Sequence, residues 1–188
     1  MNDENLEQLN SLKTFKRFNA YKRHEYHIEV WEKFWKHTIK TNKEDNILDF
    51  GCGAGWSKYI GRNYHDNIDL LDIDTKEVKD VFSQFHKILK IDSVFYWDGN
   101  EMPLKDNEYD IIISKASMSK LVSSNWENVI SELVRLSKNK ASWYIAPPYM
   151  LERLITNPFS EKTNSKIKNK EIELLTWDWG WRDPRNYD

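Results

Sequence analysis

The sequence of 188 residues contains a single cysteine, Cys52, and no apolar run near the roughly 18 residues that a membrane-spanning helix needs. One cysteine cannot form a disulfide within the chain, and it argues against a cysteine-based metal site. The polar start MNDENLEQLN lacks the apolar stretch of a secretory signal. We therefore expect a cytoplasmic protein with no membrane contact and no bound metal.

The sequence also lacks a strong net charge. A formal charge of −2 gives no overall attraction to nucleic acid. Residues 11–43 nevertheless hold nine Lys or Arg against three Glu, a local excess of six positive charges. Such a run is usually a solvated helix face, which we favour over a basic surface for an anionic substrate or nucleic acid.

Short apolar runs alternate with amphipathic stretches between residues 46 and 146. Strands are expected at 47–50, 68–74, 93–97, 109–114 and 142–146, and helices at 56–63, 75–90 and 126–137. This alternation predicts an α/β fold, a doubly wound and mostly parallel sheet of Rossmann-like type with helices on both faces.

The two flanks of this core differ from it. Residues 12–40 have aromatic residues at helical spacing, so we expect one or two helices there, the second near 25–38. Residues 1–45 would form a helical cap within the same domain as residues 46–188. After the fifth strand we expect a short helix at 149–155, a loop rich in Lys and Asn, and a last strand near 171–179.

Three glycines at alternating positions, Gly51, Gly53 and Gly55, follow the first strand directly. Such a turn lets backbone N–H groups approach a ligand at a helix N-terminus. A nucleotide-triphosphate loop and the dinucleotide fingerprint both need a glycine at position 56, where this chain has Trp56. The first class is therefore excluded and the second disfavoured.

Two acidic residues follow neighbouring strands. Asp72 lies 21 residues after Gly51, at the tip of the second strand, where a carboxylate can accept both hydroxyls of a ribose. Asp98 ends the third strand and precedes Gly99, where its carboxylate could accept a proton from an exocyclic amine. A nucleoside could lie across these strand ends.

Both assignments have an alternative. Asp74 could bind the ribose in place of Asp72, although an N-cap role in a capping box with Glu77 already explains the presence of Asp74. Asp98 and Gly99 could simply form a turn.

These motifs together resemble the class I S-adenosylmethionine-dependent methyltransferases, most closely the small enzymes of ubiquinone and menaquinone biosynthesis (methyltransferase domain type 11). ILDFGCGAG is similar to the first motif of that family and LLDID to the second. YWDGNEMPLKDNEYDIIIS resembles the segment that leads into the fourth strand, and WENVISELVRLSKNKASWYIAPP the fifth helix and strand. The resemblance implies strand order 3-2-1-4-5. The short remainder implies a reduced C-terminal hairpin, with one antiparallel strand near 171–179.

The resemblance implies S-adenosylmethionine as cofactor and S-adenosylhomocysteine as product. Its implied contacts are Asp49 for the methionine amino end, the backbone of Gly51, Cys52 and Gly53 for methionine and ribose, Asp72 for the ribose hydroxyls, Ile73 beside the adenine, Asp98 and Gly99 for the adenine amine, and Ser114 with Lys115 facing the methyl group.

The sequence does not identify the catalytic residue or the acceptor, because in methyl transfer the cofactor supplies the reactive group and the protein positions the acceptor. Candidates by position are Lys115, Tyr149, Tyr21, His24 and His27, each more typical of a structural role. The loop SKASMSKLVSS lacks the histidine common in close relatives.

We expect a small-molecule acceptor. The alternatives are a nucleic-acid or protein methyltransferase that uses the basic N-terminal helices, and a non-catalytic binding subunit. No oligomeric state follows from the sequence. Trp177, Trp179 and Trp181 alternate at period two. We interpret them as the packing face of an edge strand, in preference to an aromatic platform for the acceptor.

Overall fold

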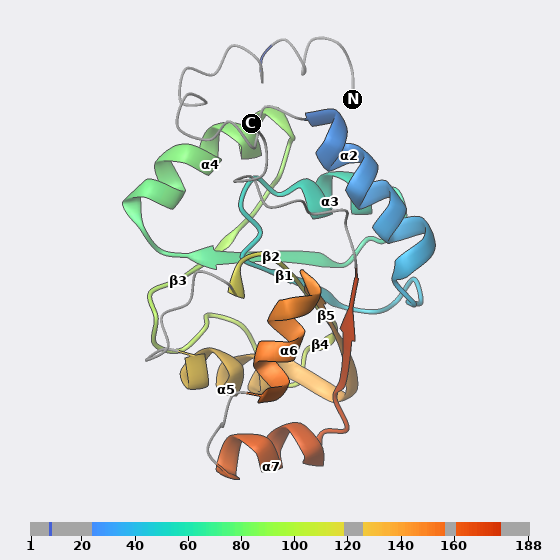
Figure 1. Cartoon of the computed structure of the whole chain (residues 1–188). Coiled ribbons are helices and arrows are strands. Elements are labelled where there is room, and N and C mark those ends of the chain that lie inside the picture. Colours follow the sequence, from blue (N-terminus) through green and yellow to red (C-terminus); the bar gives the residue numbers. More distant parts are fainter. Residues whose placement is uncertain (1–7, 9–23, 119–125, 157–160, 178–188) are drawn as a thin grey trace, which may run out of the picture.

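A computed structural model describes residue 8 and residues 24–118, 126–156 and 161–177 (Figure 1). Its centre is a six-stranded sheet of order β3-β2-β1-β4-β5-β6. The strands are β1 (Ile47–Phe50), β2 (Ile68–Ile73), β3 (Phe95–Trp97), β4 (Tyr109–Lys115), β5 (Ser137–Ala146) and β6 (Glu173–Thr176). The central strands are mostly apolar, as in the run 111–113 of β4, because helices cover both of their faces.

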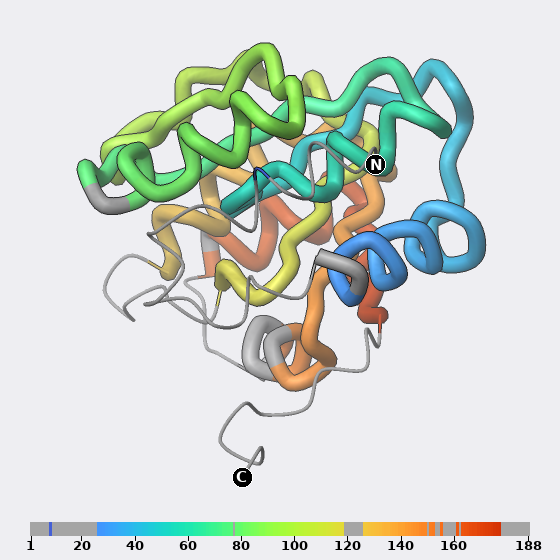
Figure 2. The backbone as a smooth tube through the Cα atoms, turned by 90° about the horizontal axis from the view of Figure 1, so that it is seen from above, coloured from blue at the N-terminus to red at the C-terminus, as the bar shows by residue number. Residues whose placement is uncertain are grey.

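Helices form a layer on each side of the sheet. They are α2 (His24–Lys33) with the π-helical turn η3 (Phe34–Thr38), α3 (Trp56–Gly61), α4 (Lys76–Ile88), α5 (Trp126–Leu136), α6 (Pro148–Thr156) and α7 (Glu161–Asn169). One face carries α2, α3 and α4, and the other carries α5 and α7 (Figure 1). Seen from above, α2 and α4 lie at opposite ends of their layer (Figure 2). In the described ranges no helix combines the length and apolar character that crossing a bilayer requires.

The Rossmann-like sheet with order 3-2-1-4-5 is confirmed, but the expected antiparallel last strand was wrong. β6 runs parallel to β5, with Ser142 opposite Glu173 and Ile145 opposite Thr176. The chain leaves β5 through α6 and α7 before it pairs again, and a helical crossover of this kind joins parallel strands, whereas an antiparallel neighbour follows a hairpin. α7 forms within the segment expected to be a loop.

The N-terminal helices pack into the main core through aromatic rings. Phe34 is fully buried and lies 4.5 Å from the ring of Trp177 and 5.6 Å from that of Tyr144. Trp31 lies 5.5 Å from the same Trp177. Trp177 therefore acts as a packing residue that connects the end of the described chain to α2. Trp179 lies outside the described residues, as does Trp181.

Phe34→Ala should remove about 3–5 kcal/mol from the free energy of unfolding, because it leaves a cavity among three aromatic rings. The matched control is Lys36→Ala in the same turn, whose exposed ion pair with Glu32 should contribute little to stability. Urea unfolding measures both variants. Equal losses would contradict this description of the aromatic core.

Candidate functional site

The glycine turn lies between the ends of β2 and β4. The Gly51 N–H donates to Leu71 O at 2.7 Å, and Gly51 has a left-handed backbone with φ of +76°. A Cβ atom at this position would lie 2.0 Å from the Cβ of Ser117. Only glycine therefore fits here, for reasons of both backbone conformation and space.

The loop after β4 is pinned to this turn by two serines. The Ser117 hydroxyl donates to Phe50 O at 2.7 Å, and its oxygen lies 2.7 Å from Ser114 Oγ. Ser114 is buried, so its hydroxyl serves the packing of this loop, and its contact with a cofactor stays a prediction. Ser117 was not among the predicted site residues, because its contact with Gly51 joins segments far apart in the sequence.

Asp72 closes the turn from the end of β2. Its Oδ2 accepts from the Gly53 N–H at 2.7 Å, and its Oδ1 accepts from the Ile73 N–H at 2.8 Å. The Cys52 thiol lies 3.9 Å from Oδ2, and burial raises the pKa of this thiol. Ile73 is a large apolar residue with 42% of its surface exposed. The structure thus brings together four of the predicted site residues, with an apolar side chain open to solvent beside a carboxylate.

α4 holds the other side of the turn. His86 Nε2 lies 2.8 Å from Gly53 O, so this nitrogen must carry a proton and donate it. Burial lowers the pKa of His86, which favours the neutral ring.

The helix itself begins after Thr75, whose hydroxyl accepts from the Val78 N–H at 3.2 Å. The expected N-cap at Asp74 was therefore wrong, because the extended backbone that an N-cap requires belongs to Thr75. Asp74 instead pairs with Lys79 at 2.6 Å.

Asp98 and Gly99 form an exposed bend after β3. Asp98 Oδ1 accepts from the Asn100 N–H at 3.0 Å, and this backbone hydrogen bond lowers the pKa of Asp98. Gly99 has a φ of +104°, and nothing lies within 4 Å of the place where its Cβ would be. The carboxylate therefore serves the turn, as the structural interpretation expected, while its exposed side remains accessible to a ligand.

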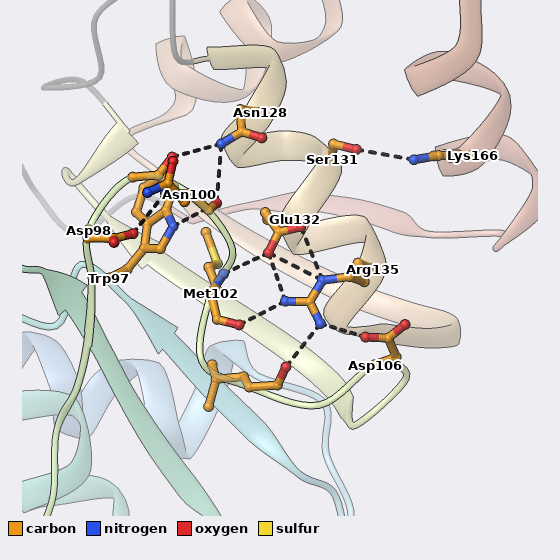
Figure 3. A network of polar contacts seen from close by, with 12 residues as sticks. Trp97, Asp98, Asn100, Met102, Asp106, Asn128, Ser131, Glu132, Arg135 and Lys166 are labelled. Atoms are coloured by element: carbon orange, nitrogen blue, oxygen red, sulfur yellow. Dashed lines mark hydrogen bonds and ion pairs between the residues drawn. The ribbon is translucent and has the colours of Figure 1, made fainter.

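A polar stripe on α5 fixes this bend (Figure 3). Asn128 donates to Gly99 O at 2.9 Å, Glu132 accepts from the Met102 N–H at 2.8 Å, and Arg135 donates to Met102 O at 2.9 Å. The three side chains are spaced four and three apart, so they lie on one helix face. These three residues were not predicted as part of the site, although polar residues at helical spacing beside the apolar face of α5 were a usable signal.

A second polar group lies under α2. Asp49 is 2% exposed on β1 and accepts a hydrogen bond from the Ser57 hydroxyl of α3. Burial raises the pKa of Asp49 to about 7, and burial lowers the pKa of Lys115, at the end of β4, to about 8. Lys115 Nζ lies 3.5 Å from His27 Nδ1, on α2.

Two of the five positional candidates for catalysis therefore meet in the fold, Lys115 and His27. Tyr149 lies at the start of α6 and is 47% exposed. Tyr21 lies outside the described residues, and so does the side chain of His24.

Comparison with known proteins agrees with the fold. A family model described as a methyltransferase domain matches residues 47–140. The search of curated proteins found no match.

Three solved structures share the fold. The PH0226 protein of Pyrococcus horikoshii is 17% identical, with a TM-score of 0.55 over 77% of this chain and 71% of that chain. A chain from the complex between the Haloferax volcanii Trm112 methyltransferase activator and a methyltransferase is 14% identical. Its TM-score is 0.51, over 83% of this chain and 73% of that chain. A Galdieria sulphuraria protein described as a sarcosine dimethylglycine methyltransferase is 14% identical. Its TM-score is 0.50, over 80% of this chain and 62% of that chain.

Gly51→Ala and Gly99→Ala form a matched pair that tests the tight turn. Both place an alanine at positive φ, which costs about 1–3 kcal/mol, but only Gly51→Ala adds a clash with Ser117. Overpacking of this kind costs about 1–3 kcal/mol more, so Gly51→Ala should unfold at a clearly lower urea concentration than Gly99→Ala. Equal midpoints for the two variants would contradict the close approach of the two loops.

The pKa of Asp49 predicts a pH dependence of stability. Burial raises this pKa from 3.8 to about 7, so the folded state holds the proton more tightly than the unfolded state. Relative to Asp49→Asn, the wild type should therefore lose at least about 1 kcal/mol of stability as the pH rises from about 4 to about 7. Urea unfolding of both proteins across this range measures the difference. A constant difference would show that Asp49 titrates normally.

Proposed function

Because the chain belongs to the methyltransferase domain family, we propose that it transfers a methyl group from S-adenosylmethionine to a small-molecule acceptor and releases S-adenosylhomocysteine. The observation that carries this proposal is the place of Asp72, whose carboxylate lies against the glycine turn with Oδ2 2.7 Å from the Gly53 nitrogen. A ribose bound beside that turn would present its two hydroxyls to this carboxylate.

The neighbouring residues fit an adenosine group. Ile73 offers an exposed apolar surface next to Asp72, on which a flat base could lie. Asp98 offers an exposed carboxylate at the end of the adjacent strand β3, suited to an amine on that base. Gly51 and Gly53 both have a left-handed backbone, which forms the tight turn after β1 beside these groups. In this proposal, the groups that contact the nucleoside lie at the ends of the three neighbouring strands β1, β2 and β3.

The cofactor, when bound, supplies a methyl group activated by a sulfonium. The chain's own residues have to hold the acceptor in line with that methyl group and keep bulk water away. α2 carries buried His27 and Trp31 over the end of β4, so it is suited to shielding the reaction. We assign no general base, since one is needed only for an acceptor that keeps its proton near neutral pH.

Two observations bear on the acceptor. In the described part of the basic segment, Lys36 forms an exposed ion pair with Glu32 at 3.3 Å, as expected of a solvated helix face. This ion pair supports our preference for a small-molecule acceptor. Lys16 and Arg17, which would serve a nucleic-acid or protein acceptor, lie outside the described residues. A binding subunit without turnover remains the competing proposal, and formation of S-adenosylhomocysteine distinguishes the two.

Asp72→Asn should weaken the binding of S-adenosylhomocysteine about tenfold or more, because hydrogen bonds to a charged group contribute about 1.5–3 kcal/mol. The matched control is Asp74→Asn, two residues along the chain, which loses only its exposed ion pair with Lys79. Isothermal titration calorimetry measures both affinities.

Three outcomes have distinct meanings. Loss of affinity in Asp72→Asn alone supports the proposed site. Loss in Asp74→Asn alone would move the ribose contact to Asp74. No binding by the wild-type chain would overturn the proposed use of S-adenosylmethionine.

A further inference from the structure

We propose that Asn128 of α5 determines how selectively the chain binds adenine, because it orients the Asp98 carboxylate through the backbone of the bend at residues 98–100. Asn128 is then a positioning residue, which acts on the base through Asp98 and has no need to touch the cofactor. This inference rests on the proposed function, in which Asp98 accepts a hydrogen bond from the amine of adenine. It adds the residue that holds Asp98 in place.

The bend that carries Asp98 is held by hydrogen bonds more than by packing. Asp98 and Asn100 are both exposed. Between them Gly99 has a φ of +104°, and beyond its chain neighbours no heavy atom lies within 4 Å of the place where its Cβ would be. Glycine in open space has more conformational freedom than any other residue. The direction of the Asp98 carboxylate therefore depends on the hydrogen bonds that the backbone of the bend makes.

A single peptide group connects Asn128 to Asp98. Asn128 Nδ2 donates to Gly99 O at 2.9 Å, and the Asn100 N–H donates to Asp98 Oδ1 at 3.0 Å. Gly99 O and the Asn100 N–H belong to the same planar peptide group, so they point in opposite directions and can only turn together. By holding the carbonyl, Asn128 also holds the N–H group that binds Asp98.

The next carbonyl of the bend is held as well (Figure 3). Asn100 O accepts from Trp97 Nε1 at 3.0 Å and from Asn128 Nδ2 at 3.4 Å. Both partners of the Asn128 amide are carbonyl oxygens, which only accept, so its NH2 group faces the bend and supplies the two N–H donors required. Trp97 is 3% exposed, and it anchors Asn100 to the core from the other side.

α5 is a rigid support for this contact. Val129 and Ile130, the two residues after Asn128, are fully buried. One turn further along the helix, Glu132 accepts from the Met102 N–H at 2.8 Å and so fastens the same loop a second time. A side chain carried by a packed helix holds its partner more accurately than one carried by a loop. Asn128 thus transfers the fixed position of α5 to the end of β3.

A carboxylate in a fixed position distinguishes bases by the group that they present to it. The exocyclic amine of adenine donates a hydrogen bond to a carboxylate, whereas a carbonyl at the same place, as in hypoxanthine, sets two acceptors against each other. A site built to bind the amine rejects the carbonyl, because the two acceptors are then left unpaired. Without Asn128, Asp98 can turn toward water, so the selectivity for the amine should fall.

The test compares S-adenosylhomocysteine with its deaminated analogue S-inosylhomocysteine by calorimetry. The wild type should bind S-adenosylhomocysteine about tenfold more tightly than the analogue. In Asn128→Ala this ratio should fall to about threefold or less, and Asn128→Gln, which keeps the donor, should restore part of it. The matched control is Ser131→Ala on the same helix, which loses an exposed hydrogen bond from Lys166 and should keep the wild-type ratio.

The ratio separates a role in selectivity from a merely structural role. An unchanged ratio in Asn128→Ala, or an equal loss of both ligands, would overturn the assignment of Asn128, and so would an equal fall of the ratio in Ser131→Ala. Asp98→Ala should bind both ligands equally.

Failure of the underlying site gives different results. If the wild type binds both ligands equally, or if Asp98→Ala keeps the wild-type ratio, Asp98 does not recognise the amine. This inference is then overturned, while the use of S-adenosylmethionine stands. Failure of the wild type to bind S-adenosylhomocysteine would overturn the proposed function itself.

Discussion

The close approach of the glycine turn to its two neighbours is the constraint on which the site depends. Asp72 Oδ2 accepts from the Gly53 N–H at 2.7 Å, and Ser117 occupies the space that a side chain at Gly51 would need. These contacts join the ends of β2, β1 and β4 into one surface. The residues proposed to hold ribose, base and methionine lie in sequence along it because the parallel strands all end at the same edge.

The cover of that surface depends on a second set of contacts far away in the sequence. Phe34, just after α2, packs 4.5 Å from Trp177, and α2 carries His27 and Trp31 over Lys115. The aromatic content of the chain thus has a functional consequence, because ring packing fixes the helix that covers the charged end of the site. Burial of Asp49 and Lys115 under this helix explains why the pKa values of both are shifted toward neutrality.

The apolar runs predicted the alternation of strands and helices, and the three glycines with their spacing to Asp72 predicted the turn, because these are local patterns. The strand order came from the resemblance to the methyltransferase family. The sequence was insufficient where distant segments decide the outcome. The direction of β6 depends on the crossover through α6 and α7. The N-cap of α4 is different, because the choice lies between the adjacent residues Asp74 and Thr75 and depends on the backbone conformation of Thr75. The packing of Ser117 on Gly51 joins residues 66 positions apart, so no local signal could have revealed it.

The most direct test of the account is a crystal structure of the chain with S-adenosylhomocysteine. We predict both ribose hydroxyls within about 3 Å of the Asp72 carboxylate, the adenine on Ile73, and the amino-acid end beside Asp49. A ligand bound elsewhere, or an adenosine that leaves Asp72 in contact only with the protein, would contradict the account.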